Sequence, residues 1–215
     1  MKRKELMVFA GPNASGKSTV IKATDYPGEY ICPDSLVPPG KRQSVEAYLE
    51  AMQQCEKMRK TKLKNGESFT FETVLSSPEK LAFLRLAKKQ GYKITVHYIT
   101  TNDYNINIKR AASRQALGGH GVPTDKLIAR WERTMSLMYS VIEIADIARV
   151  YDNSGASPVL VFAKQPDGTQ LLLNREQRHP WTQRYIIDKA AARGIPIAHD
   201  LNVWETRDWL ASIRP

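Results

Sequence analysis

The residues with the clearest chemistry lie near the N-terminus, where Gly11-Pro12-Asn13-Ala14-Ser15-Gly16-Lys17-Ser18 fits the pattern G-x-x-x-x-G-K-[ST]. Consecutive backbone N–H groups in such a loop, at the start of a helix, form a cradle for an anion. The spacing lets the lysine reach the β- and γ-phosphates of a nucleotide and lets the serine hydroxyl ligate Mg²⁺. The sequence therefore predicts a nucleotide phosphate site made by these residues: Gly11, Asn13, Ala14, Ser15, Gly16, Lys17, Ser18 and Thr19.

The rest of the sequence narrows what the nucleotide is used for. The chain contains no N-K-x-D segment, so a guanine-specific switch protein is not indicated. Residues 117–120 (Leu-Gly-Gly-His) echo the signature loop of transporter ATPases, but no apolar run ends in the Asp-Glu pair with which those ATPases hold Mg²⁺. With these two classes of nucleotide-binding protein not indicated, the sequence favours phosphoryl transfer to a bound acceptor. In that reaction the protein positions a hydroxyl and neutralises phosphate charge.

Two carboxylates follow predicted strands. Asp34 comes after a short strand predicted at 29–32, and Glu72 comes after one predicted at 68–71. Because ligands in open α/β sheets bind outside the carboxyl ends of the strands, both acids are expected at the nucleotide site. There Asp34 would accept a proton from an attacking hydroxyl or hold Mg²⁺ through water, and Glu72 would bind acceptor hydroxyls. The alternative is structural: Asp34 begins a turn and Glu72 caps the next segment.

Arginines flank the glycine-rich segment 118–121. Two helices that are joined by glycines and carry arginines are typical of a lid that closes on phosphates and excludes water. The planar guanidinium pairs bidentately with phosphate oxygens, and Arg110 and Arg114, four residues apart, share one helix face. A solvated basic face is the alternative. The basic residues concerned are Lys109, Arg110, Arg114, Arg130 and Arg133.

Strands and helices must alternate to position these groups, and the apolar pattern predicts that they do. Residues 6–10 form an apolar run typical of a strand buried on both faces. Further strands are predicted at 29–32, 68–71, 93–100 and 148–151, a hairpin at 158–173, and helices at 17–24, 44–64, 77–90, 103–117 and from 123 onward. This order predicts an α/β three-layer sandwich with a central, mainly parallel sheet, a helical lid and a short C-terminal helical tail.

The composition is that of a soluble globular protein with an excess of positive charge. Lys+Arg number 32 and Asp+Glu 22, a net charge of +10, and hydrophobic residues make up 42%. No apolar run approaches the ~18 residues of a membrane span, and the apolar stretch after the basic start is too short for a signal peptide. We therefore expect a cytoplasmic protein with an anionic partner and no membrane contact. Cys32 and Cys55 form no metal-binding pattern, and Cys32 is expected to be a small apolar residue.

Together these segments resemble the zeta toxin family, bacterial kinases of the P-loop fold. The resemblance covers residues 5–174 and implies a P-loop kinase-like fold. The matching segments are the phosphate loop, Cys32-Pro33-Asp34, Phe71-Glu72-Thr73, Arg110-x3-Arg114-x3-Leu117-Gly118-Gly119-His120-x-Val122-Pro123, Arg130-Trp131-Glu132-Arg133 and Asp152-Asn153-Ser154.

The resemblance implies ATP-dependent phosphorylation of the sugar of a nucleotide sugar, UDP-N-acetylglucosamine in the characterised type, by an enzyme usually restrained by an antitoxin. Lys17 and Ser18 would bind the phosphates and Mg²⁺, and Asp34 would be the base. The lid arginines would clamp the transferring phosphoryl group, with Arg114 and Arg130 as the best candidates.

Further roles follow from the same resemblance. Glu72, Thr73 and His120 would lie at the acceptor, and Arg110 and Asn153 at the ATP. The kinase domain would span residues 1–174. Residues 175–215 would form a helical extension packed on the core, with an antitoxin or self-association surface as the alternative.

Other functions stay open on sequence grounds. The acceptor could instead be a nucleoside, an antibiotic or a nucleic-acid end, because P-loop kinases share the same phosphate apparatus. The charge of +10 also fits a nucleic-acid-binding ATPase regulator, but the chain shows neither a recognition-helix motif nor an RNA-binding aromatic signature. An inactive nucleotide-bound interaction module is the third class. Because Lys17 and the lid arginines converge on a predicted phosphate site, the charge favours a small anionic substrate over a polymer.

Overall fold

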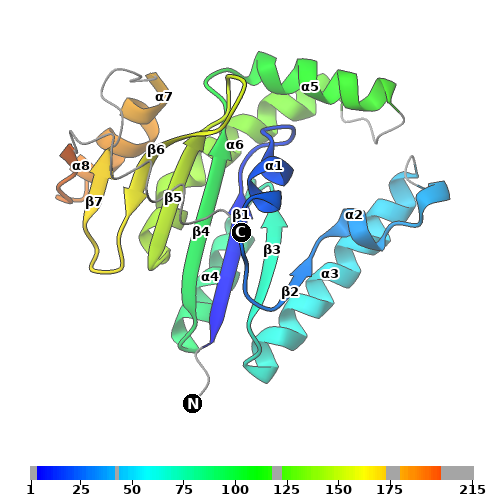
Figure 1. Cartoon of the computed structure of the whole chain (residues 1–215), viewed down its shortest axis with the longest axis horizontal. Coiled ribbons are helices and arrows are strands. Elements are labelled where there is room, and N and C mark those ends of the chain that lie inside the picture. The colour runs from blue at the N-terminus through cyan, green and yellow to red at the C-terminus, as the bar shows by residue number, and fades with distance from the viewer. Residues whose placement is uncertain (1–3, 42–43, 118–122, 173–179, 200–215) are drawn as a thin grey trace.

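The computed structural model describes residues 4–41, 44–117, 123–172 and 180–199, which fold around one eight-stranded sheet. The strand order is β2-β3-β1-β4-β5-β6-β7-β8 (Figure 1). Strands β1 to β5 run parallel, and β6 and β7 add an antiparallel hairpin. The strands are β1 (Glu5–Ala10), β2 (Glu29–Ile31), β3 (Phe69–Thr73), β4 (Lys93–Thr100), β5 (Ile147–Asp152), β6 (Val159–Lys164), β7 (Gln170–Leu172) and β8 (Ala198–His199).

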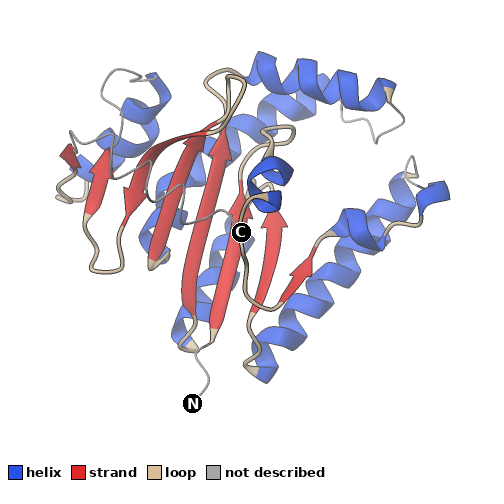
Figure 2. Cartoon of the chain, in the orientation of Figure 1, coloured by secondary structure: helices blue, strands red, loops and turns tan. Residues whose placement is uncertain are grey.

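Helices connect the parallel strands, as the sequence predicts (Figure 2). The helices before β5 are α1 (Lys17–Lys22), α2 (Pro33–Leu36), η1 (Pro39–Lys41), α3 (Val45–Asn65), α4 (Pro78–Lys89), α5 (Tyr104–Ala116) and α6 (Thr124–Ile144). After β7 come α7 (Pro180–Thr182), the π-helix η3 (Gln183–Ile187) and α8 (Asp188–Ala191). The sheet with helices on both faces confirms the predicted three-layer α/β class.

Local chemistry sets several helix boundaries. The Ser44 side chain accepts a hydrogen bond of 3.1 Å from the Ala47 N–H and so begins α3. Gly66 ends the same helix in the left-handed conformation, with φ of 68°. Asp103 begins α5 by accepting a hydrogen bond of 2.8 Å from the Asn105 N–H. These boundaries follow from residue type alone and agree with the sequence predictions.

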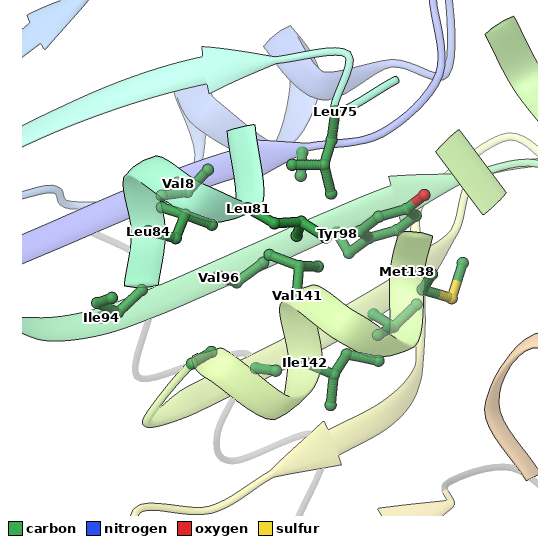
Figure 3. Packing of buried hydrophobic residues seen from close by; sticks show 14 of the residues in the cluster. Val8, Leu75, Leu81, Leu84, Ile94, Val96, Tyr98, Met138, Val141 and Ile142 are labelled. Atoms are coloured by element: carbon green, nitrogen blue, oxygen red, sulfur yellow. The ribbon is translucent and has the colours of Figure 1, made fainter. Parts of the chain in front are cut away.

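The larger apolar core lies between one face of the sheet and helices α4 and α6. Alternate residues of β1 and β4, such as Val8 and Val96, point into it and meet Leu84 of α4 and Val141 and Ile142 of α6 (Figure 3). On the opposite face, Phe9 and Ile99 pack against a smaller cluster that includes α1. Successive side chains of β1 and β4 therefore point to opposite faces of the sheet and pack against the helices on each face.

The C-terminal part of the chain combines helix with one strand that the sequence analysis does not predict. Residues 180–191 are helical, and Trp181, Tyr185 and Ile186 join the larger core. Beyond them Ala198 and His199 form β8, which pairs in parallel with β7. Residues 200–215 of the predicted helical extension and the predicted glycine hinge at 118–121, His120 included, lie outside the described residues. The division at residue 174 stays a prediction. Among the helices described, none has the length and hydropathy that would let it cross a bilayer.

His97 of β4 is buried, with 2% of its surface exposed. Its ring stacks between Phe9 and Tyr151, with centroid distances of 5.0 Å and 5.9 Å. Burial, reinforced by the nearby charge of Arg149, lowers the pKa of His97 from 6.5 to about 3. The imidazole is therefore neutral in the folded protein.

We predict that His97 makes folding acid-sensitive. Between pH 6.5 and 3 the unfolded chain binds a proton at this residue and the folded chain does not, so the stability that it contributes is lost as the pH falls from 6.5. The free energy of unfolding should drop by about 1.4 kcal/mol per pH unit in this window. Urea unfolding at pH 7 and pH 5 should show a smaller drop for His97→Phe than for the unmodified protein, and equal drops would contradict the prediction.

Candidate functional site

The phosphate loop follows β1 and packs closely on the neighbouring strand. A Cβ on Gly11, whose φ is 142°, would lie 1.9 Å from the Ile99 carbonyl oxygen of β4. Ala14 has a φ of 56°, in the left-handed region that non-glycine residues rarely adopt, and Gly16 has a φ of 90° at the N-cap of α1. The loop therefore has a fixed and partly strained backbone, which is common at functional sites.

Two asparagines from distant segments hold this loop. Asn153, directly after β5, donates from Nδ2 to the Ser15 carbonyl oxygen at 2.8 Å. A Cβ on Gly16 would lie 2.0 Å from the same Nδ2, so only glycine fits there. Asn107 of α5 donates to the Asn13 carbonyl oxygen at 2.7 Å. The loop shape thus depends on contacts with segments more than 90 residues away in the sequence.

Some polar atoms of the loop have no partner within the part of the chain that the structure describes. Ser15 is fully buried, and its Oγ makes no hydrogen bond with the described residues. The buried Oδ1 of Asn13 also has no hydrogen-bond partner among them. Buried polar groups without a partner are costly and usually indicate a missing ligand or water. Ser18 and Thr19 are exposed in the first turn of α1. These groups fit a bound phosphate chain and its metal ion.

Lys17 folds back over the loop that precedes it. Its Nζ donates to the Gly11 carbonyl oxygen at 3.1 Å and to the Pro12 carbonyl oxygen at 2.9 Å. Burial lowers the pKa of the Lys17 ammonium, while the nearby carboxylates of Glu72 and Asp34 act in the opposite direction. The lysine therefore lies among the two acids that the sequence places at strand ends.

The two carboxylates come together beside the loop. Oxygens of Asp34 and Glu72 and the Sγ of Cys32 all lie within 4.8 Å of one another. Asp34 is exposed in the first turn of α2, where the sequence suggests only a turn. Glu72 lies within β3 rather than after it, because the pairing with β1 continues as far as Ala10 and Thr73. Either way, both acids are at the carboxyl edge of the parallel strands.

The segment after β3 is strained and is attached to α6. Thr73 accepts a hydrogen bond of 3.0 Å at Oγ1 from the Leu75 N–H, and the buried Leu75 has a φ of 53°. Thr134 of α6 donates from Oγ1 to the Val74 carbonyl oxygen at 2.9 Å. Thr73, predicted to bind the acceptor, is thus held by the turn that follows it. That turn is attached to Thr134, which lies four residues after Arg130 on α6.

The predicted lid arginines take different places. Arg114 is exposed on α5, and its positive charge contributes to lowering the pKa of Lys17. Arg110 donates to the carbonyl oxygens of Asn153, at 2.8 Å, and Gly155, at 3.4 Å. Arg130 is half-buried on α6, and within the described ranges no hydrogen bond or ion pair joins it to the loop. Of these three arginines, Arg114 acts on Lys17 electrostatically, and Arg110 fastens α5 to the segment after β5.

Sequence reasoning missed three residues that shape the site: Asn107, Tyr30 and Cys32. Asn107 precedes Arg110 by three and Arg114 by seven, so helical spacing alone places it on the same face. Tyr30 lies two residues before Cys32 and therefore on the same side of an extended segment. Cys32, expected to be only a small apolar residue, directs its Sγ to Oε1 of Glu72 at 3.4 Å.

A mainly parallel sheet with a phosphate loop after its first strand, and with both acids at the carboxyl edge, defines a P-loop kinase fold. Solved structures agree. The chain resembles a structure of the PezAT chromosomal toxin–antitoxin system of Streptococcus pneumoniae, with a TM-score of 0.52, 14% identity and coverage of 90% of this chain and 85% of that one. It also resembles AvrRxo1-ORF1:-ORF2 with ATP, with a TM-score of 0.61 and 15% identity, covering 77% of this chain and 60% of that one.

A second structure of the AvrRxo1-ORF1:AvrRxo1-ORF2 complex, with sulphate ions, has a TM-score of 0.62 and 14% identity and covers 99% of this chain and 77% of that one. At these identities the likeness shows the fold. A comparison with curated protein sequences gives no match. The zeta toxin family model matches residues 36–166, more than half of the 215-residue chain. The chain belongs to the zeta toxin family, and its phosphate loop, which lies outside the matched range, supports that assignment independently.

We predict that Asn107 stabilises the phosphate loop. It is 2% exposed, it donates to the Asn13 carbonyl oxygen, and it accepts from the Thr101 hydroxyl. Asn107→Ala removes the donor to the buried Asn13 carbonyl oxygen and leaves the Thr101 hydroxyl with the Asp103 carbonyl oxygen as its acceptor, and we expect the free energy of unfolding to fall by about 1–3 kcal/mol. Urea denaturation measures the loss. The control is Asn105→Ala, an exposed residue on the same helix whose removal should cost less than about 0.5 kcal/mol. Equal effects of the two variants would contradict the prediction.

Proposed function

We propose that the protein is an ATP-dependent kinase that transfers the γ-phosphate to a sugar hydroxyl of a nucleotide sugar of the UDP-N-acetylglucosamine type. The proposal rests on one observation above all: the loop lysine Lys17 lies among the carboxylates of Asp34 and Glu72. A phosphate-binding cation and two acids in one place are what hydroxyl phosphorylation requires. Membership of the zeta toxin family supports the same reaction class.

Each residue has a role in this reaction that its position supports. Asp34, exposed beside the loop, would accept the proton of the acceptor hydroxyl. The hydroxyl oxygen would then form a bond to the γ-phosphorus, and the bond from that phosphorus to the β–γ bridging oxygen would break, so that ADP leaves. Lys17 and Arg114 would stabilise the charge on the transferring group. Arg130 is proposed for the same clamp on the basis of its place in the family pattern.

The acceptor would be held by residues at the end of β3. The Glu72 carboxylate can accept hydrogen bonds from sugar hydroxyls, and Thr73 lies next to it. Mg²⁺, when bound, would neutralise phosphate charge, and the exposed hydroxyl of Ser18 is the ligand that the loop offers for it. Asn13, Ser15 and Asn153 would surround the nucleotide phosphates.

We also propose that a protein of the antitoxin type restrains this activity. Zeta toxin family membership supports it. The similar structures described above are of a toxin–antitoxin system and of a complex of two named components, ORF1 and ORF2.

The acceptor class is tested by incubating the purified protein with ATP labelled at the γ-phosphate and a panel of acceptors. We expect label to appear on UDP-N-acetylglucosamine, because a diphosphate sugar suits a site rich in arginine and lysine. The panel includes a nucleoside, an aminoglycoside antibiotic and a 5′-hydroxyl oligonucleotide. Label on one of these alone would identify a different acceptor, and label on none would overturn the kinase proposal.

We predict that Asp34→Ala abolishes transfer and leaves ATP binding intact, because the carboxylate acts on the acceptor hydroxyl and not on the nucleotide. The turnover number should fall by at least about 100-fold. Lys17→Ala should weaken both ATP binding and transfer. The matched control is Asp167→Ala, an exposed acid in the β6–β7 turn at the opposite edge of the sheet (Figure 1).

Undiminished product formation by Asp34→Ala would exclude this residue as the base. The same variant tests the toxic role in cells. If phosphorylation is what harms the cell, expression of the unmodified protein should arrest growth and expression of Asp34→Ala should not.

A further inference from the structure

Two residues without a role in the proposed reaction surround the Glu72 carboxylate. Cys32 donates from Sγ to Oε1 of Glu72 at 3.4 Å. Its backbone is extended, with φ of −136° and ψ of 132°, where β2 passes into α2. Extension makes side chains alternate, so Tyr30 and Cys32 face the same side while Ile31 points into the larger core. The strand thus presents a phenol and a thiol together to one carboxylate.

The protonation of both groups suits them to donate hydrogen bonds. Burial, and then the negative charge of Glu72, raises the pKa of the Cys32 thiol to about 12. The pKa of Tyr30 is also raised, first by burial and then by the negative charge of Glu72. At neutral pH both side chains therefore keep their protons.

Glu72 lies between these donors and the phosphate loop. The ammonium of Lys17 interacts electrostatically with the same carboxylate. A glutamate has a long, flexible side chain, and without opposing contacts this attraction would draw the carboxylate toward the Lys17 ammonium. Cys32 is only 6% exposed, so it has little surface with which to meet a substrate directly. Its effect on an acceptor would have to pass through Glu72.

We propose that Cys32, with Tyr30 beside it, is a positioning residue that orients the Glu72 carboxylate toward the acceptor and away from Lys17. The proposal rests on the proposed function, in which Glu72 binds acceptor hydroxyls. A carboxylate already held in place loses less conformational freedom when the acceptor binds. The expected consequence is confined to acceptor affinity, because neither residue lies in the phosphate loop.

The test measures the KM for UDP-N-acetylglucosamine and the KM for ATP separately. Cys32→Ala should raise the acceptor KM about 3- to 10-fold, the equivalent of one hydrogen bond, and leave the ATP KM unchanged. Tyr30→Phe should act in the same direction. Cys32→Ser keeps a donor and should restore the acceptor KM to within about twofold. Cys55→Ala, at the other buried cysteine, is the matched control and should change neither KM.

A purely structural role gives a different pattern. Equal changes in both KM values for Cys32→Ala, or failure of Cys32→Ser to restore the acceptor KM, would overturn the proposal. A double-mutant cycle with Glu72→Ala, which removes the acceptor oxygen, adds a stricter criterion: in that background Cys32→Ala should have no further effect on the acceptor KM, and additive effects would overturn the proposal.

Failure of the proposed function can be told apart from failure of this inference. If the unmodified protein phosphorylates no acceptor, the proposed function is wrong. The coupling of Cys32 to Glu72 is then measured by urea unfolding of the unmodified protein, the two single variants and the double variant. This measurement does not depend on enzymatic activity. Non-additive unfolding free energies would support the contact, and additive ones would overturn it.

Discussion

The site depends on how tightly the phosphate loop packs against the ends of its neighbouring strands. At Gly11 the loop backbone approaches the carbonyl of Ile99 so closely that a single added carbon would collide with it, and at Gly16 the side chain of Asn153 takes up the same space. The close packing therefore requires glycine at both positions, and the hydrogen bond from Asn153 to the Ser15 carbonyl oxygen ties the loop to the segment after β5. This packing fixes the position of Lys17, which follows the loop. Asp34 in α2 and Glu72 in β3 lie beside it at the carboxyl edge of the parallel strands.

Charge at the site is organised around Lys17. Taking an ammonium out of water is unfavourable, and the lowered pKa of Lys17 reflects this. The carboxylates of Asp34 and Glu72 compensate in part, whereas Arg114 adds further positive charge. A phosphate group bound next to Lys17 would favour the charged ammonium, because a nearby negative charge raises the pKa of a lysine.

Side-chain hydrogen bonds attach helices α5 and α6 to the segments that form the site. Asn107 and Arg110 fasten α5 to the phosphate loop and to the segment after β5. Thr134 fastens α6 to the strained turn that follows β3. These hydrogen bonds fix α5 and α6 relative to the carboxyl edge of the sheet. The groups proposed to clamp the phosphoryl group are therefore held in a fixed position relative to those proposed to bind the acceptor.

The sequence alone determined those features that depend on the chemistry of residues close together in the chain. The apolar run before Gly11, the capping residues Ser44 and Asp103, and the glycine-lysine loop identify strands, helix ends and the phosphate site, because each depends on near neighbours in the chain. Contacts between distant segments were decided only by the tertiary structure. The Cys32 thiol at Glu72, Asn107 at the loop and the pairing of β8 with β7 join residues brought together by strand order, and residue type by itself does not specify that order.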